Sequence, residues 1–367
     1  MQARRKKKIK SDDDWFKEVF GIRESLNEID RFISICEDDG KVVLKDKNGN
    51  NYYSGVFSIR DISSFHNLSN RGNGTFSIVK YEEIISDKEK IFSSFGMLQS
   101  FKEFCGATFQ LETQFNCLNF ISKEQTAGNG ISCYVYDNQN STIASLGTSA
   151  SLLYRNYFVE SKGQIGDEID LLDKTPINVI HGFPIIQEND ITKIKDKIDW
   201  NDLDNYKVGT QQYCQVILSP NEDGFSFVKY PQYVNHVFVS SFSFQDNVIK
   251  DRFTYLIAEN LLEAEYKLTI LSSWENSILY QDLIGSKICF LTFIGCSFQL
   301  NPIQIVINSI LSLENLISQS GLNVFLFINK YNFYNSISQL SSIVEKTNGK
   351  IINNINDFYR LFNLPID

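Results

Sequence analysis

The sequence contains no run of about 18 uncharged apolar residues, which excludes an ordinary transmembrane helix. Its basic first residues, MQARRKKKIK, are not followed by the apolar core of a signal peptide, so secretion is not expected. These two absences predict an intracellular, cytoplasmic protein with no membrane partner. The basic N-terminus has two interpretations, a solvated disordered tail or a nuclear-import tag, and the second would place the protein in the nucleus.

Residues that bind metals or form disulfides are scarce or scattered. The only histidines are His66, His181 and His236, and the seven cysteines include no CxxC pair. Most cysteines sit among apolar residues, as Cys289 does, which is typical of buried reduced thiols. We therefore expect no metal and no cofactor. A net charge of −9 argues against a nucleic-acid partner, because phosphate contacts need a concentrated basic face.

What the sequence does contain is typical of a soluble globular protein, with 43% hydrophobic and 22% charged residues. Residues 1–13 predict a disordered basic and acidic tail. Residues 14–90 mix short helical segments, one of them expected over 26–35, with alternating segments, which predicts an α+β region packed on the core. Residues 91–367 predict the main α/β domain, and the irregular stretch 159–235 predicts an inserted or loop-rich section within it.

Unbroken apolar strands alternate with amphipathic helices from residue 234 onward, which indicates a mostly parallel sheet covered on both faces. The expected strands are 237–240, 288–294, 322–328 and 350–352, and the expected helices are 253–271, 302–318 and 334–345.

Residues 109–158 combine the features of a ligand site. An extended run from Phe109 leads to Asn116, a polar small-residue loop opens at Asp137, and a helix is expected at 145–157. In α/β proteins, ligand sites form at the carboxyl ends of strands in this way.

Several motifs of the chain resemble one family. They are QFNCL (114–118) with Gly130, Tyr134 and Asp137 following, YRNYF (154–158), LLEAEYKLTI (261–270) and LTFIGCSFQLNP (291–302). They resemble a poorly characterised group of macrodomain-like proteins, and extend to MavL-type hydrolases, bacterial effectors that remove ADP-ribose from arginine. The resemblance spans nearly the whole chain.

This resemblance implies a macrodomain-like three-layer α/β/α sandwich with a mixed, mostly parallel sheet and an N-terminal α+β extension. The implied function is binding of ADP-ribose and its hydrolysis from modified protein side chains, with arginine as the modified residue. The partner would be ADP-ribose or an ADP-ribosylated protein, ubiquitin being one candidate.

The resemblance makes Asp137 and Glu263 the candidate catalytic residues. Asp137 would hold the target arginine or act as general base, and Glu263 would pair with it to position water. Each residue has a structural alternative, because Asp137 is also typical of a turn and Glu263 of a solvated helix face.

Six residues are candidates for substrate binding: Asn116, Gly147, Gly295, Ser297, Phe298 and Asn301. Asn116 would orient the distal ribose through its amide, or else cap the next helix. Segments 138–150 and 295–301 would cradle the diphosphate, although the second is also an ordinary strand–helix turn. Phe298 would stack on the ligand or belong to the core. Arg155 would contact a phosphate or clamp a loop through its fork of donors.

Both segments lack glycines that the family carries, such as those of the family's GGGAFG, where this chain reads GCSFQL (295–300). Glycines let backbone N–H groups approach a pyrophosphate closely. The side chains that replace them here leave less room for the pyrophosphate beside the backbone. A second hypothesis therefore stands beside the enzyme: a non-catalytic ADP-ribose reader or interaction module with a degenerate site.

Overall fold

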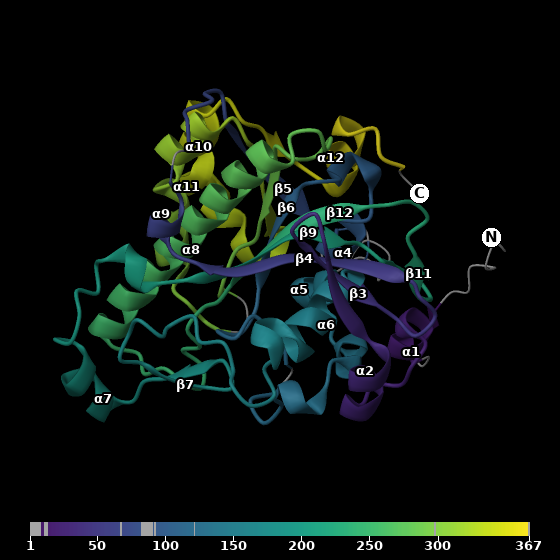
Figure 1. Ribbon diagram of the computed structural model, residues 1–367. Coiled ribbons are helices and arrows are strands. Elements are labelled where there is room, and N and C mark those ends of the chain that lie inside the picture. Colours follow the sequence, from purple (N-terminus) through teal and green to yellow (C-terminus); the bar gives the residue numbers. More distant parts are fainter. Residues whose placement is uncertain are drawn as a thin grey trace.

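The computed structural model describes residues 9–10, 14–66, 68–81, 91, 93–120, 122–296 and 299–365. Within these ranges, ten strands form one sheet (Figure 1). Its order is β15 (Ile351–Ile352), β5 (Thr75–Tyr81), β14 (Asn323–Asn329), β13 (Ile288–Leu291), β6 (Thr108–Glu112), β12 (Tyr233–Val239), β9 (Val208–Gln215), β4 (Asn51–Arg60), β3 (Lys41–Lys45) and β2 (Ser34–Asp38).

The sheet is mixed. Pairings from β15 to β12 are parallel, and those from β12 to β2 are antiparallel. The parallel strands are continuous apolar segments such as Phe325–Ile328, because both faces of this half are covered by helices. The predicted α/β class with a mixed, mostly parallel sheet is confirmed.

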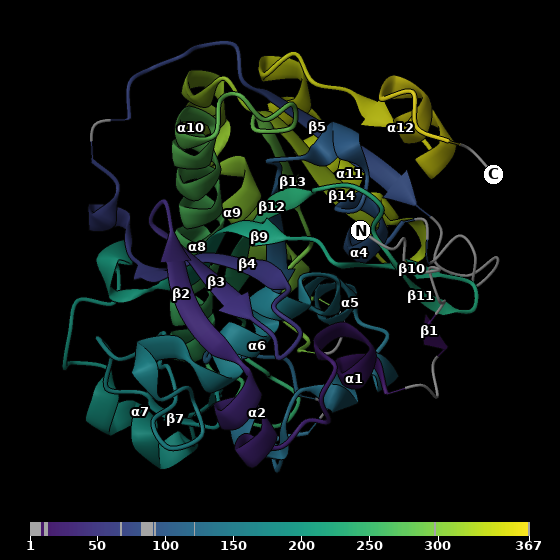
Figure 2. The same cartoon turned by 45° about the vertical axis from the view of Figure 1, so that its right-hand side comes forward.

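Helices cover both faces of the sheet (Figures 1 and 2). Strand β6 shows the alternation, because Thr108 and Gln110 bond to helix α8 while Phe109 packs against Phe95 on the opposite face. The first face carries α8 (Arg252–Leu279), α9 (Ile303–Leu311), α10 (Glu314–Ser320) and α11 (Lys330–Lys346). The second carries α4 (Phe95–Leu98), α5 (Asn140–Gly147), α6 (Ser149–Tyr157) and α12 (Ile355–Leu361).

The N-terminal strands belong to the main sheet. Strand β4 pairs with β9, so β2–β4 extend the sheet on its antiparallel side, and β5 lies between β15 and β14 in the parallel half. Helices α1 (Trp15–Phe20) and α2 (Leu26–Phe32) pack beside α6 and share a second apolar cluster with it (Figure 2). Of the expected tail 1–13, only Ile9–Lys10 is described, as strand β1; the rest lies outside the described residues.

The irregular stretch 159–235 contains several short elements besides β9. They are β7 (Asn178–Ile180), β8 (Phe183–Ile185), α7 (Glu188–Ile194), β10 (Leu218–Asn221) and β11 (Gly224–Phe227). Strands β10, β11 and β1 form a small sheet, and β7 with β8 forms a hairpin. Short 3-10 helices complete the fold at Ile62–Ser64, Lys102–Phe104, Ala127–Asn129, Ser132–Tyr136, Val159–Ser161 and Leu203–Asn205.

Several boundaries differ from the prediction, and three of these differences change the elements themselves. The segment 138–150, expected to be largely a loop, is mostly helical because α5 begins at Asn140. The helix expected over 302–318 is two helices, since α9 ends at Leu311 and α10 begins at Glu314. The helix expected over 26–35 ends at Phe32, and the following residues form β2.

Among the described residues, no helix is both long and apolar enough to cross a membrane.

Candidate active site

The carboxyl ends of β6, β12 and β13 meet at one edge of the sheet, because the three strands are parallel neighbours. Glu112, the last residue of β6, connects them. Its Oε1 accepts a hydrogen bond of 3.0 Å from Ser241 Oγ, just beyond β12. The same oxygen accepts a 3.0 Å bond from the backbone N–H of Gly295, in the loop after β13. One carboxyl group thus gathers three strand ends.

The electrostatics of Glu112 suit proton transfer. Burial raises the pKa of its carboxyl to about 7, and the hydrogen bonds from Ser241 and Gly295 oppose that shift only in part. The side chain is half-buried rather than enclosed, and Oε2 has no partner among the described residues. A carboxyl group that titrates near neutral pH can act as either acid or base.

A second carboxyl group, that of Glu265, lies beside Glu112 on the α8 side of the sheet. Oε1 of Glu265 accepts a 2.7 Å hydrogen bond from the backbone N–H of Ser240, while the buried Oε2 has no partner within the described ranges. Burial raises its pKa well above the usual range, the Ser240 bond opposes this, and the charge of Glu112 adds to it. Burial of Glu265 therefore favours the protonated, neutral form of its carboxyl group.

The loop after β13 turns sharply at Gly295. Its φ is +71°, and a Cβ there would lie 2.5 Å from Nδ2 of Asn301 and 2.8 Å from Oγ of Ser241. Asn301 closes the loop, since its backbone N–H and its Nδ2 both donate to the Gly295 carbonyl, over 3.0 and 3.1 Å. Only glycine fits this position without strain. The predicted contacts Ser297 and Phe298 lie outside the described residues.

Asn116 is buried in the turn that follows β6. Its Oδ1 accepts a hydrogen bond from the backbone N–H of Leu118 at 3.2 Å, the Asx-turn geometry of a turn-forming asparagine. Its Nδ2 donates to Oε2 of Glu168 over 3.3 Å. The amide therefore contacts protein groups on both its oxygen and its nitrogen.

Asp137 forms the turn before α5. Its Oδ1 accepts a 2.9 Å bond from the backbone N–H of Gln139, and its Oδ2 a 2.6 Å bond from the Thr142 hydroxyl. Both oxygens thus hold the first turn of the helix. This places α5 beside the end of β6, where Nδ2 of Asn119 donates both to the Glu112 carbonyl and to Ser141 Oγ.

The structure does not bring Asp137 and Glu263 together. Glu263 lies on α8 and forms an ion pair of 2.5 Å with Lys267, one turn along the helix. Asp137 precedes α5, on the other face of the sheet. Gly147 is packed against protein as well, since a Cβ there would lie 2.3 Å from Nε2 of Gln99, the residue that follows α4.

Of the two interpretations of Arg155, the structure matches the clamp on a loop. Its fully buried guanidinium donates to the Cys117 carbonyl at 3.2 Å and to Oε1 of Gln211 at 2.6 Å, and it lies 4.0 Å from the ring centroid of Phe238. It clamps the turn that contains Asn116 onto the sheet.

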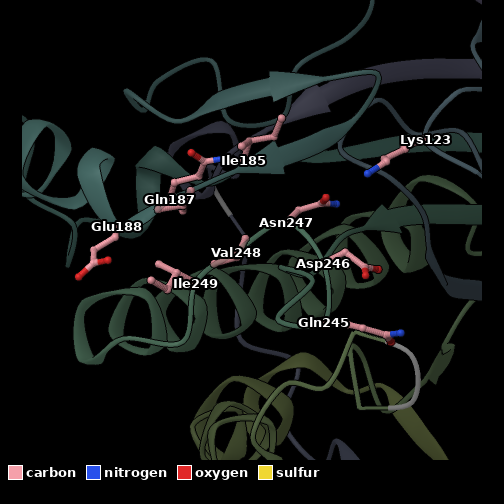
Figure 3. A pocket seen from close by; sticks show the side chains of 10 residues that line it. Lys123, Ile185, Gln187, Glu188, Gln245, Asp246, Asn247, Val248 and Ile249 are labelled. Carbon is pink, nitrogen blue, oxygen red and sulfur yellow. The ribbon is translucent and has the colours of Figure 1, made fainter.

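A cavity of about 420 Å³ opens between the segments that follow β12, β6 and β8 (Figure 3). The segment after β12 is tied to the loop after β13, because the Phe244 N–H donates to the Gln299 carbonyl over 2.9 Å. Polar and apolar side chains both line the cavity, and Lys123 contributes a positive charge. The lining residues are Lys123, Ile185, Ile186, Gln187, Glu188, Gln245, Asp246, Asn247, Val248 and Ile249. Among the described residues, no group of three or more His, Cys, Asp or Glu side chains could hold a metal ion.

Sequence reasoning missed Glu112 and Glu265. Their signals were present, because Glu112 ends the alternation of Thr108 and Gln110 toward α8. Glu265 follows Leu261 by four residues, which puts it on the buried stripe of the helix.

No protein-family model matches the chain, and no curated protein matches it. Among solved structures, it is similar to a poly(ADP-ribose) glycohydrolase from Deinococcus radiodurans in complex with ADP-ribose, with 12% identity, 78% of this chain and 95% of that chain covered, and a TM-score of 0.40. It is also similar to the glycohydrolase from Thermomonospora curvata, with 9% identity, 88% and 96% coverage, and a TM-score of 0.38.

Proposed function

We propose that this protein binds ADP-ribose and hydrolyses the glycosidic bond that joins it to a modified side chain, arginine being the substrate residue. The observation that carries the proposal is the raised pKa of the Glu112 carboxyl group, together with its position at the end of β6. This carboxyl group has a pKa of about 7 and sits where the loops after β12 and β13 meet. Glycosidic hydrolysis needs a group that gives a proton to the leaving atom, and a carboxyl group with a raised pKa supplies it at neutral pH.

The motifs that resemble macrodomain-like proteins surround this carboxyl group. QFNCL follows Glu112 directly, and LTFIGCSFQLNP contains Gly295, whose N–H the carboxylate accepts. The resemblance favours ADP-ribose as the ligand, and the raised pKa favours catalysis on it. In this proposal Glu112 replaces Glu263 as the catalytic carboxyl group.

The remaining residues support the reaction in this proposal. The Asn116 amide, expected to orient the distal ribose, is fully buried and holds the Glu168 carboxylate instead, and Asp137 fixes the start of α5. The start of α5 and the Gly295–Asn301 loop face the diphosphate, because backbone N–H groups at a helix start favour anions.

A non-catalytic ADP-ribose reader is the second candidate function. It is favoured by the state of the two carboxylates first expected to be catalytic: both oxygens of Asp137 hold a helix turn, and Glu263 pairs with Lys267. A protein of this kind would bind ADP-ribose but would have no side chain that gives a proton to the leaving group.

Calorimetric titration with ADP-ribose, followed by hydrolysis of arginine-ADP-ribosylated protein, separates the two functions. The proposed enzyme binds and releases ADP-ribose, and Asp137→Ala weakens binding by loosening α5. Binding without turnover would favour the reader. Absence of binding would contradict both functions.

A further inference from the structure

Three polar side chains from separate segments form a hydrogen-bonded chain beside the end of β6. Nδ1 of His181 lies 2.9 Å from Oε1 of Glu168. The Asn116 amide donates to Oε2 of the same carboxylate over 3.3 Å. Glu168 therefore connects an imidazole to the buried amide of the turn that follows β6.

His181 sits at the tip of the β7–β8 hairpin, whose strands pair up to Ile180 and Phe183. The turn residues His181 and Gly182 both have positive φ, 50° and 77°, as a two-residue type I′ turn requires. Asparagine or glycine is the usual first residue of such a turn. A histidine in this strained conformation is the kind of outlier that clusters at functional sites.

The hairpin tip is fixed against the turn after β6. The Gly182 carbonyl accepts a 2.9 Å hydrogen bond from the Phe115 N–H. A Cβ on Gly182 would lie 2.8 Å from Cγ of Asn116, so the Gly182 backbone lies closer to the Asn116 side chain than any other residue type would allow. His181 is thereby held close to Asn116.

The segment that carries Glu168 is tied to the same turn. The Gln164 side chain donates to the Asn116 carbonyl over 3.0 Å and accepts a 3.0 Å bond from the Ile169 N–H. The Leu171 N–H donates to the Phe115 carbonyl, also over 3.0 Å. The carboxylate is thus anchored by bonds on both sides of it in the chain.

This geometry sets the chemistry of the imidazole. A carboxylate at Nδ1 favours the tautomer with its proton there, which leaves a lone pair on Nε2. Nε2 has no partner among the described residues, and 43% of the His181 side chain is exposed, so water or a ligand can reach it. A carboxylate that orients an imidazole in this way is the arrangement of a general base.

We propose that His181 is the general base of the hydrolysis and that Glu168 is its positioning residue, an assignment that rests on the proposed function. Nε2 takes a proton from water as the water oxygen bonds to the anomeric carbon of the ribose. The bond from that carbon to the guanidino nitrogen breaks, and its electron pair stays on nitrogen. Glu112 gives that nitrogen a proton. The proton that His181 took from water then passes through solvent to Glu112, so atoms and charges balance and both groups regain their starting state.

Kinetics on the full chain tests the assignment of His181. His181→Asn keeps a residue that tolerates positive φ, so the hairpin should fold. It should lower kcat by about 10²- to 10⁴-fold, the usual worth of a general base, while ADP-ribose affinity is kept. His66→Asn, which removes another exposed histidine, should leave kcat unchanged.

Nitrogen-15 NMR of the imidazoles tests the role of Glu168. The chain has 3 histidines, so the spectrum is simple and His181→Asn assigns the signal. Wild type should show the Nδ1–H tautomer, with a signal that shifts when ADP-ribose is added. Glu168→Gln should change the tautomer population and lower kcat with KM kept.

The outcomes separate the two proposals. If wild type is active and His181→Asn hydrolyses the substrate equally fast, His181 is not the general base, and the proposed function still stands. A His181 signal that ignores bound ADP-ribose would also overturn the role of His181. Wild type that neither binds nor hydrolyses the substrate would overturn both.

Discussion

The backbone N–H of Gly295 donates a 3.0 Å hydrogen bond to the side chain of Glu112. This bond joins the end of β6 to the loop after β13, 183 residues further along the chain. It also partly offsets the burial that raises the pKa of the Glu112 carboxyl. The position of the proposed acid therefore depends on a loop that only glycine can form.

Replacing that glycine should disturb the fold and the acid together. In Gly295→Ala the methyl group would meet Asn301 and Ser241, on a backbone with positive φ. We expect a loss of about 1–3 kcal/mol in the free energy of unfolding, measured by urea denaturation. Gly166→Ala is the control, since a Cβ there meets nothing within 4 Å. Equal stability of the two variants would contradict the clash.

The buried acid Glu265 should make stability depend on pH. Its folded pKa is raised well above the ordinary glutamate value of 4.5, so the folded state keeps a proton that the unfolded state loses. This contribution is present below pH 4.5 and is lost as pH rises toward the folded pKa. His236, with its pKa lowered well below 6.5 by burial, acts in the opposite direction.

Comparison with Glu265→Gln removes the effect of His236, because both proteins contain that residue. From about pH 5 to about pH 8 the wild type should lose stability relative to the variant. Urea unfolding at both pH values measures this difference. A difference that does not change with pH would mean that Glu265 is ionised in the folded state.

The strands and the helix stripe could be predicted because they are local patterns. Unbroken apolar runs such as Val324–Ile328 are buried on both faces, and the spacing of Leu261 and Leu268 defines one face of α8. The residues at which helices and strands begin and end are harder to predict. Residues 140–147 form a helix, and Asp137 bonds to Gln139 and Thr142 at its start, a contact that composition shows only weakly.

The site could be predicted only in outline. The motifs pointed to the sheet edge where β6, β12 and β13 end, but the acid that gathers these three strand ends was not apparent from them. Glu112 became notable only through Ser241 and Gly295, which are distant in sequence. Such contacts depend on topology, which no local pattern specifies.

Arg155 should be a stability residue. Its guanidinium is buried, with hydrogen bonds to Cys117 and Gln211 and a face against Phe238. Lysine cannot reproduce this fork of donors, so Arg155→Lys should cost about 3 kcal/mol in the free energy of unfolding. The exposed Arg252→Lys should change it by less than about 0.5 kcal/mol. Denaturant titration of both variants checks this, and a neutral Arg155→Lys would contradict the clamp.

Glu24 should hold the segment that leads to Asp137. Its carboxylate accepts hydrogen bonds from the backbone N–H groups of Ile131 and Ser132, at 2.6 and 2.7 Å, and from the Tyr157 hydroxyl at 2.7 Å. In Glu24→Gln, the amide would turn a donor toward these donors.

We expect Glu24→Gln to lose about 2 kcal/mol of stability and to exchange the amide hydrogens of residues 131–137 faster. The exposed Asp30→Asn serves as its control. Unchanged exchange in Glu24→Gln would show that Glu24 does not hold this segment.

The most direct test of the central claim is the release of ADP-ribose from arginine-ADP-ribosylated protein under single-turnover conditions, near pH 6. Glu112→Gln should still bind ADP-ribose but release it about 10²- to 10⁴-fold more slowly than wild type, while Glu263→Gln should match wild type. In wild type the rate should fall as pH rises above about 7, because Glu112 must be protonated to act as the acid. A Glu112→Gln variant as fast as wild type, or a slow Glu263→Gln, would contradict the account.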